Sequence, residues 1–299
     1  MKVLRPVVPA AAPTGQRQPI PSGLLTRALE VAGRLANDAA EVITATAGAG
    51  LRPAGAGPKD HPFDWVTDTD RTLERHTRRV LAAEFPQIPV VGEEYGSDPG
   101  AIGAPYRWVV DPVDGTANYV AGLPWYAYSL ALVDADGPVV GVLADPSRAQ
   151  IYAAARGRGV RANGVPVRAA QGGGASGSLV CTELVGGRPW PGMASFLAAC
   201  GDSRTGVRIL GSTALSIAQV ALGHAVAAVL ETYDEWDVAG ALALALEAGA
   251  VVVDRDGRPD PMPPDGLLVA VPGALSEVLG WWRAAYRERP RPNRPAAHG

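Results

Sequence analysis

The chain has 299 residues, of which 47% are hydrophobic and 19% charged, and its formal net charge is −3. This composition is typical of a folded globular protein and excludes a largely disordered chain. The small negative charge disfavours general nucleic-acid binding, which requires a concentrated basic surface. Cys181 and Cys200 are the only cysteines and are too few for a disulfide framework, so we interpret them as small buried hydrophobic residues.

Both ends of the chain are rich in proline and lack a hydrophobic period. We therefore predict a disordered leader at 1–21 and a disordered tail at 287–299. Prolines interrupt the leader before the apolar core of a signal peptide could form. The longest apolar stretch, 214–230, carries polar residues and is short for a membrane span. These features predict a cytoplasmic protein without a membrane anchor.

Two helices are predicted at the start of the ordered chain. After Ser22, which we expect to cap the first helix, apolar residues recur at helical spacing. This stripe consists of Leu24, Ala28, Val31, Leu35, Ala39 and Val42. A glycine-rich segment at 48–57 ends the first helix, and a second helix is predicted over 69–85, just before a proline.

Short apolar runs separated by Gly, Pro and Asp turns follow, and several of them form adjacent hairpins. The predicted strands lie at 89–91, 107–110, 126–133, 139–144 and 151–155, which favours a largely antiparallel sheet. After a glycine-rich boundary at 171–177, strands and helices alternate. The predicted strands here are 179–182, 207–210, 225–230, 251–253 and 267–271, and the helices lie near 194–200, from 213, over 238–248 and from 274. We therefore predict an α+β sub-domain at 22–170 and an α/β sub-domain at 171–286.

Carboxylates gather where the second predicted strand ends, in the sequence 111–116 (Asp-Pro-Val-Asp-Gly-Thr). The proline fixes its φ angle and Gly115 permits a tight turn, so Asp111 and Asp114 are held close together, and Thr116 can cap a following helix. Adjacent carboxylates repel unless one is protonated or a cation lies between them. Because Mg²⁺ prefers oxygen ligands, the pattern indicates a magnesium site, and the backbone amides beside it suit a phosphate.

Three further acidic elements are weak signals when taken singly. The sequence 92–94 (Gly-Glu-Glu) follows a predicted strand, but paired glutamates are common on solvated surfaces. The sequence 64–70 (Asp-Trp-Val-Thr-Asp-Thr-Asp) precedes the second helix, where we expect one residue to cap the helix and another to serve catalysis. In 236–240 (Trp-Asp-Val-Ala-Gly), Asp237 begins a predicted helix and alone indicates only an N-cap.

The order of the four acidic elements is more specific than any one of them. Asp-x-Val-Thr-x-x-Asp, Gly-Glu-Glu, Asp-Pro-Val-Asp-Gly-Thr and Trp-Asp-Val-Ala-Gly, in that order, resemble the inositol monophosphatase family from about residue 24 to residue 283. The resemblance implies a layered αβαβα sandwich like that of inositol monophosphatase and fructose-1,6-bisphosphatase. It also implies a Mg²⁺ cofactor, hydrolysis of a small phosphorylated polyol or sugar, and a homodimer.

The resemblance further implies roles for individual residues. The metal ligands would be Glu93, Asp111, Asp114, Asp237 and the carbonyl of Val113. Asp70, Glu93 and Thr116 would be catalytic, with Asp70 and Thr116 orienting the attacking water. The substrate contacts would be Glu93, Val113, Asp114, Gly115, Thr116, Gly211, Ser212, Thr213, Glu231 and Asp237. Lys59 resembles the basic residue of a mobile metal-binding loop, with a plain surface lysine as the alternative.

Departures from the family pattern leave the substrate open. Four residues separate Glu231 from Trp236, one fewer than in inositol-acting members, so Glu231 can be placed differently. The Ala-Asn-Tyr sequence after Asp-Gly-Thr favours an inositol monophosphate. Phosphatases of histidinol phosphate or adenosine bisphosphate often have lysine at the position of Ala117. These enzymes and fructose-bisphosphatases remain alternatives, as does a metal- and ligand-binding protein without turnover, which the complete ligand set disfavours.

Overall fold

A computed structural model of the chain describes residues 20–47, 57–58, 65–169 and 173–287. Most of the predicted leader and tail lies outside these residues, as do Lys59 and most of the glycine-rich segment 48–57. Arg287, which we assigned to the tail, is instead the last residue of helix α7 (Leu275–Arg287).

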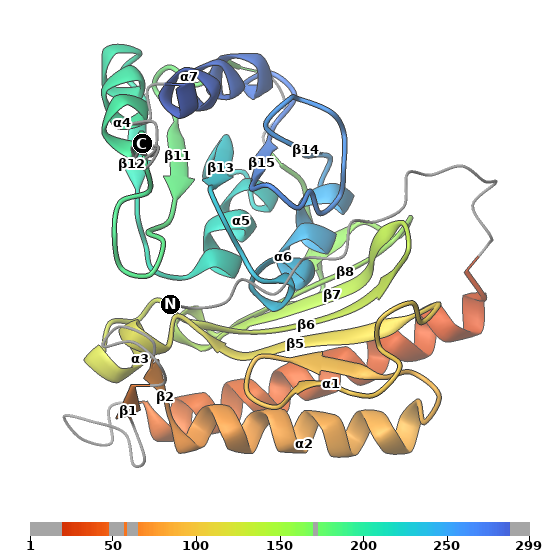
Figure 1. Ribbon diagram of the computed structural model, residues 1–299. Coiled ribbons are helices and arrows are strands. Elements are labelled where there is room, and N and C mark those ends of the chain that lie inside the picture. Colours follow the sequence, from red (N-terminus) through yellow and green to blue (C-terminus); the bar gives the residue numbers. More distant parts are fainter. Residues whose placement is uncertain (1–19, 48–56, 59–64, 170–172, 288–299) are drawn as a thin grey trace, which may run out of the picture.

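The elements form five layers (Figure 1). Helices α1 (Ser22–Thr46) and α2 (Asp68–Glu84) cover one face of an eight-stranded sheet. Helices α5 (Thr213–Ala221) and α6 (Glu235–Glu247) lie between this sheet and a five-stranded one. Helices α4 (Met193–Asp202) and α7 pack together over the outer face of the second sheet. The predicted αβαβα sandwich is confirmed.

The first sheet is largely antiparallel, as predicted, with one parallel pair between β3 and β5. In spatial order its strands are β10 (Val165–Val167), β9 (Val160–Ala162), β8 (Gln150–Ala155), β7 (Gly137–Asp145), β6 (Ala127–Asp134), β5 (Arg107–Asp114), β3 (Val90–Gly92) and β4 (Gly96–Ser97). A separate two-stranded ladder joins β1 (Gly57–Pro58) to β2 (Trp65–Val66). The short strands β1, β2, β4, β9 and β10 were not predicted.

The second sheet has five strands and contains both parallel and antiparallel pairs. Its spatial order is β12 (Gly206–Arg208), β11 (Leu179–Thr182), β13 (Ala227–Leu230), β15 (Leu267–Ala270) and β14 (Val251–Val253). The first three strands run parallel and the last two pair antiparallel. All five were predicted within two residues at each end. The helices between the sheets contact strands of both, so the division into two sub-domains at 171–177 stays a prediction.

The two N-terminal helices begin one residue earlier than their predicted caps imply. The N-cap of α1 is Pro21 and makes no side-chain cap, so the prediction that Ser22 caps this helix was wrong. The N-cap of α2 is Thr67, whose backbone N–H donates to Asp70 at 2.8 Å in a capping box. The remaining short helices are α3 (Thr116–Ala121) and the 3₁₀ turn Pro146–Arg148.

Glycines bring α6 into direct backbone contact with the first sheet. A Cβ atom on Gly141 of β7 would lie 2.3 Å from the carbonyl oxygen of Gly240 and 2.5 Å from the Cβ of Ala243. A Cβ on Gly240 would in turn lie 2.5 Å from the hydroxyl of Ser129. The absence of side chains at both positions therefore sets the distance between α6 and the sheet.

Both cysteines are buried and unpaired, as predicted. Burial raises the pKa of the Cys181 thiol to about 12 and that of Cys200 to about 11, which leaves both as unreactive thiols. Trp282 of α7 is fully buried, and Trp281 beside it is partly buried against the same core. Among the described residues, no helix combines the length and apolarity that crossing a bilayer requires.

We expect Gly141→Ala to lower the free energy of unfolding by about 1–3 kcal/mol, because the added methyl overpacks the contact with α6. Urea unfolding followed by circular dichroism measures the change. Gly33→Ala is the matched control, because nothing lies within 4 Å of the added methyl and alanine is favoured in α1 by up to about 1 kcal/mol. Equal effects of the two substitutions would contradict the close contact at Gly141.

Candidate metal and phosphate site

The central acidic segment is a bulged strand followed by a tight turn. Strand β5 runs on to Asp114, so the prediction that it ends at Val110 was wrong; its pairing with β6 slips between Asp111 and Asp114. Such a bulge changes the direction of side chains along a strand. Gly115 follows at φ +90° and is the N-cap of α3. Thr116 is therefore not the cap but the first helical residue, which corrects a second prediction.

Asp111 is the most strongly perturbed acid of this segment. Its side chain is 2% exposed and accepts a hydrogen bond from the backbone N–H of Val113 at 3.1 Å. Burial raises the pKa of Asp111 well above its usual range, and the charges of Glu93, Asp114 and Asp237 raise it further. Four acids from three separate stretches of sequence therefore act on one another around the buried Asp111.

Glu93 is placed by a second, buried glutamate. Glu74 of α2 is fully buried and accepts hydrogen bonds from the backbone N–H groups of Glu94 at 2.7 Å and Tyr95 at 3.2 Å. The turn passes so close that a Cβ on Gly92 would lie 2.1 Å from a carboxylate oxygen of Glu74. Glu74 thus fixes the backbone that carries Glu93.

Asp114 reaches across to the start of α5. Its carboxylate accepts hydrogen bonds from the backbone N–H groups of Thr213 at 3.1 Å and Ala214 at 2.8 Å, and from the Ser212 hydroxyl. Burial raises the pKa of Asp114 to about 6, although these hydrogen bonds act in the opposite direction. The predicted substrate-binding turn 211–213 is therefore brought directly beside the predicted metal-binding segment.

Asp70 and Thr116 meet at the same place. The Thr116 hydroxyl lies 2.8 Å from the carbonyl oxygen of Val113 and 3.3 Å from a carboxylate oxygen of Asp70. Asp70 is fully buried and also contacts the hydroxyl of its own helix cap, Thr67. The sequence led us to expect capping by one residue and catalysis by another. Asp70 instead belongs to the capping box and to the candidate site.

Asp237 is held at the N-terminus of α6, which begins at Glu235 rather than at the predicted residue 238. Asp237 is therefore not the N-cap. The N-cap is Asp234, whose backbone N–H donates a hydrogen bond to the Asp237 carboxylate at 2.8 Å. Burial and the charge of Glu93 raise the pKa of Asp237 well above its usual range.

Glu231 lies in a different environment from the other predicted substrate contacts. Its carboxylate forms an ion pair with Arg255 at 2.7 Å and accepts from the indole N–H of Trp282 at 3.3 Å. These partners belong to the region around α7. Its role as a substrate contact stays a prediction, as do the roles of the other site residues.

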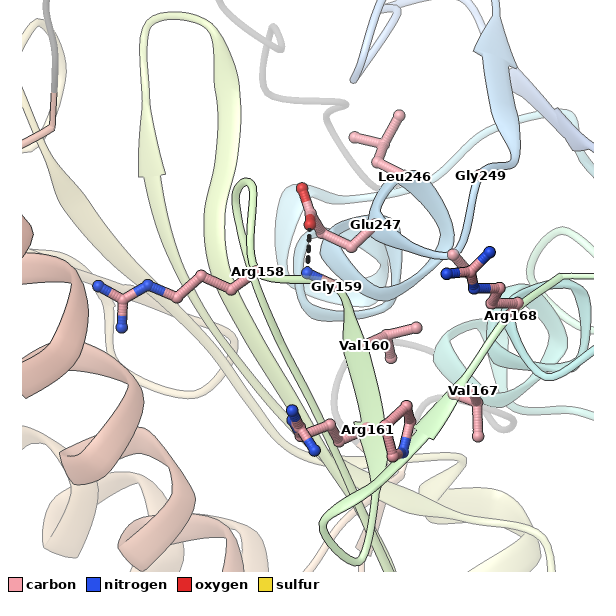
Figure 2. Close-up of a pocket in the computed structure, with 11 residues that line it drawn as sticks. Arg158, Gly159, Val160, Arg161, Val167, Arg168, Leu246, Glu247 and Gly249 are labelled. Carbon is pink, nitrogen blue, oxygen red and sulfur yellow. Dashed lines mark hydrogen bonds between the residues drawn. The ribbon is translucent and has the colours of Figure 1, made fainter.

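A surface hollow of about 450 Å³ lies elsewhere, between the β8–β9 turn, β10 and the end of α6 (Figure 2). Glu247 accepts from the backbone N–H of Gly159 there at 2.8 Å. The side chains of Arg158, Arg161 and Arg168 point in different directions in Figure 2 rather than toward one centre. None of the predicted site residues lines this hollow.

Comparisons with known proteins agree with the geometry. The sequence model of the inositol monophosphatase family matches residues 24–285. An inositol-1-monophosphatase of Mesorhizobium japonicum is 35% identical over 224 residues, covering 73% of this chain and 82% of that protein. A Nus factor SuhB of Xylella fastidiosa is 34% identical over 205 residues, covering 67% and 72% respectively. The chain belongs to the inositol monophosphatase family.

Solved structures of family members share the fold. An IMPase of Thermotoga maritima is 25% identical and has a TM-score of 0.78 over 87% of this chain and 98% of that one. An IMPase/NADP phosphatase complexed with Mg²⁺ and phosphate is 21% identical, with a TM-score of 0.76 over 87% and 96%. The relatives named inositol-1-monophosphatase are phosphoric monoester hydrolases, and the chain is an enzyme of this class.

The oxygen donors that this family member brings together fit a hard divalent cation. Glu93, Asp111, Asp114, Asp237 and the carbonyl of Val113 offer only oxygen ligands, which Mg²⁺ prefers. Burial, and to a lesser degree the neighbouring acids, raise the pKa values of Asp111, Asp114 and Asp237, and a cation between the carboxylates would oppose this effect. Within the described ranges, no three Asp, Glu, His or Cys side chains already stand at metal-ligand spacing. Asp114 and Asp237 instead direct oxygens at backbone amides.

Sequence reasoning missed two buried acids that support the site. Glu74 occupies the buried face of α2 with Asp70, Leu73 and Leu81, a position where a charge is unexpected and therefore informative. Glu183 directly follows β11 and accepts from the backbone N–H of Gly211 at 2.8 Å. Glu183 follows a strand that contains no acid, and Glu74 lies four residues beyond Asp70, outside the motif that drew attention to that segment.

Glu183 gives a prediction for the pH dependence of stability. Burial raises its pKa from 4.5 to about 7, against the opposing hydrogen bonds from Ser216, Gly211 and Leu210. The folded protein therefore retains a proton that the unfolded chain releases, and the free energy of unfolding falls as pH rises through this window. At 1.36 kcal/mol per pKa unit, the contribution lost is about 3 kcal/mol.

We therefore expect Glu183→Gln to remove most of this decline, since glutamine does not titrate. Urea unfolding without divalent metal, at pH values from 4.5 to 8, measures the difference between the variant and the wild type. The other site acids are present in both proteins and cancel in that difference. Glu30→Gln, the same change at an exposed position of α1, is the control. A wild-type decline that persists in Glu183→Gln would contradict the assignment.

Proposed function

We propose that this protein hydrolyses a small phosphorylated polyol or sugar in a Mg²⁺-dependent reaction, with a myo-inositol monophosphate as the substrate. One observation carries the proposal. Glu93, Asp111, Asp114 and Asp237 interact electrostatically at a buried point, and the hydrogen-bonded pair of Asp70 and Thr116 adjoins it.

When bound at these acids, Mg²⁺ would lower the pKa of a water molecule and neutralise phosphate charge. Glu93, Asp111, Asp114, Asp237 and the Val113 carbonyl would hold it. Asp70 would accept a hydrogen bond from the Thr116 hydroxyl, 3.3 Å away, and so orient the oxygen of that hydroxyl toward an attacking water. Both residues lie in the first turn of a helix, Asp70 in α2 and Thr116 in α3, which restricts this geometry before substrate binds.

Support for the substrate class comes from the relatives. Several are named inositol-1-monophosphatase, and one similar structure is complexed with Mg²⁺ and phosphate. The turn 211–213 lies against Asp114, where it would meet a substrate bound through its phosphate. A homodimer and a cytoplasmic location stay predictions. The name Nus factor belongs to the relatives that bear it, and we extend no such role to this chain.

We expect Asp111→Asn to keep the fold and lose Mg²⁺-dependent turnover by at least about a hundredfold, because even residues behind a metal ligand contribute 10- to 100-fold. Asparagine retains the oxygen that accepts from Val113 but loses the charge. Phosphate release is measured with inositol monophosphates, histidinol phosphate, fructose 1,6-bisphosphate and adenosine 3′,5′-bisphosphate, with and without Mg²⁺.

The control is Asp202→Asn, which makes the same change at an exposed position of α4 and should leave turnover unchanged. Wild-type activity in Asp111→Asn would exclude Asp111 from the metal site. A preference of the wild type for histidinol phosphate or a bisphosphate would retain the chemistry and replace the substrate. Magnesium binding without hydrolysis of any compound would favour a binding protein.

A further inference from the structure

Asn118 joins the two segments that meet at the candidate site. It lies in α3, two residues after Thr116, and is half-buried. Its side-chain amide nitrogen donates to the carbonyl oxygens of Trp125 and Leu210, each at 2.8 Å. One amide group therefore binds the loop after α3 to the strand-to-helix turn before α5, which is 92 residues further along the chain.

The backbone around this amide has no spare room. A Cβ atom on Gly211 would lie 2.9 Å from the amide nitrogen of Asn118. A Cβ on Gly115 would lie 2.9 Å from the carbonyl oxygen of Trp125 and 3.0 Å from that of Gly211. Because both glycines also have positive φ angles, larger residues are excluded on two grounds. The turn 210–213 is thus in direct contact with the metal-binding segment.

Asp114 also connects the segment 111–118 to the turn before α5, but its carboxylate is in addition a proposed metal ligand. Its carboxylate holds the hydroxyl of Ser212 and the amides of Thr213 and Ala214. A bound cation would compete with those donors for its oxygens. Asn118 is neutral, and its amide nitrogen is a donor that cannot ligate a cation. Its two hydrogen bonds are therefore independent of the metal.

We propose that Asn118 is a positioning residue that keeps the turn 210–213 in place for the substrate when Asp114 engages the metal. The proposal rests on the proposed function, in which this turn faces the polyol. Displacement of substrate-facing groups by about 1 Å can lower a rate a hundredfold. The loss should therefore fall on substrates with ring hydroxyls rather than on the metal-assisted chemistry itself.

The test compares Asn118→Ala with Asn37→Ala. Asn37 also donates its side-chain amide to a backbone carbonyl, that of Gly33 at 2.7 Å, but on the exposed surface of α1. For Asn118→Ala we expect kcat/KM for inositol monophosphate to fall roughly 10- to 100-fold, mainly through KM. For p-nitrophenyl phosphate, which has no ring hydroxyls, we expect a fall of less than about threefold. Asn37→Ala should leave both unchanged.

Hydrogen exchange of the amides at 210–216, with and without Mg²⁺, provides a readout that does not depend on the substrate. In the wild type, protection should persist when Mg²⁺ is added, whereas in Asn118→Ala it should fall about tenfold on that addition. Asn118→Ser, which retains one possible donor, should give an intermediate result and replaces the alanine variant if that does not fold.

Two results would overturn the proposal. One is unchanged protection of 210–216 in the variant with Mg²⁺ present. The other is an equal loss of kcat/KM for both phosphates together with a lowered melting temperature, as a purely structural role would give. If the wild type hydrolyses no polyol phosphate, the proposed function fails, and the exchange experiment still decides whether Asn118 holds the turn.

Discussion

Four carboxylates, two of them buried and two partly buried, meet at one point, and the rest of this structure depends on that constraint. Transfer of a single ion from water into the protein costs several kcal/mol even after relaxation. Two of the four acids sit at helix N-termini: Asp237 is the third residue of α6, and Asp114 binds the first amides of α5. A helix terminus contributes about 0.3–1 kcal/mol to a nearby charge, up to about 2. The helix N-termini alone therefore cannot offset the cost of bringing these charges together, and a bound cation would offset the remainder.

The same constraint explains the supporting residues. A cluster of charges keeps its geometry only if the backbone that carries it cannot move. Here the backbone is held by close contacts at glycines, whose lack of a side chain lets neighbouring groups approach. Gly92 leaves room for Glu74, Gly211 leaves room for Asn118, and Gly141 meets Gly240. The contact at Gly92 positions Glu93, the contact at Gly211 positions the turn 210–213, and the contact at Gly141 positions the helix that carries Asp237. The rigidity of the site thus originates in packing outside it.

The sequence predicted the layers and the acidic motifs well because both depend on local patterns. Strands 179–182 and 251–253 are buried apolar runs and match the structure at both ends. The hairpin of β9 and β10 was missed because it is short and largely exposed, with Val165 at 64% exposure. The continuation of β5 through Asp114 depends on its pairing with β6. The cap of α3 depends on the left-handed backbone of Gly115, and the cap of α6 was missed although Asp234 and Asp237 form a local capping box. Glu74 and Glu183 could not be recognised because burial, which gives a lone acid its meaning, is set by residues distant in sequence.

Glu231 is the predicted substrate contact whose surroundings differ most from those of the other predicted site residues. Glu231, expected at the polyol, is 8% exposed and paired with Arg255, whose guanidinium also stacks over Trp282 at 4.4 Å and Tyr286 at 3.9 Å. Detaching the carboxylate from this pair would leave the arginine without a charged partner in a partly buried setting, which is costly. The shortened spacing between Glu231 and Trp236 is consistent with this altered placement. We therefore propose that a larger share of substrate recognition falls to the turn 210–213, which accepts or donates hydrogen bonds with Asp114, Glu183 and Asn118.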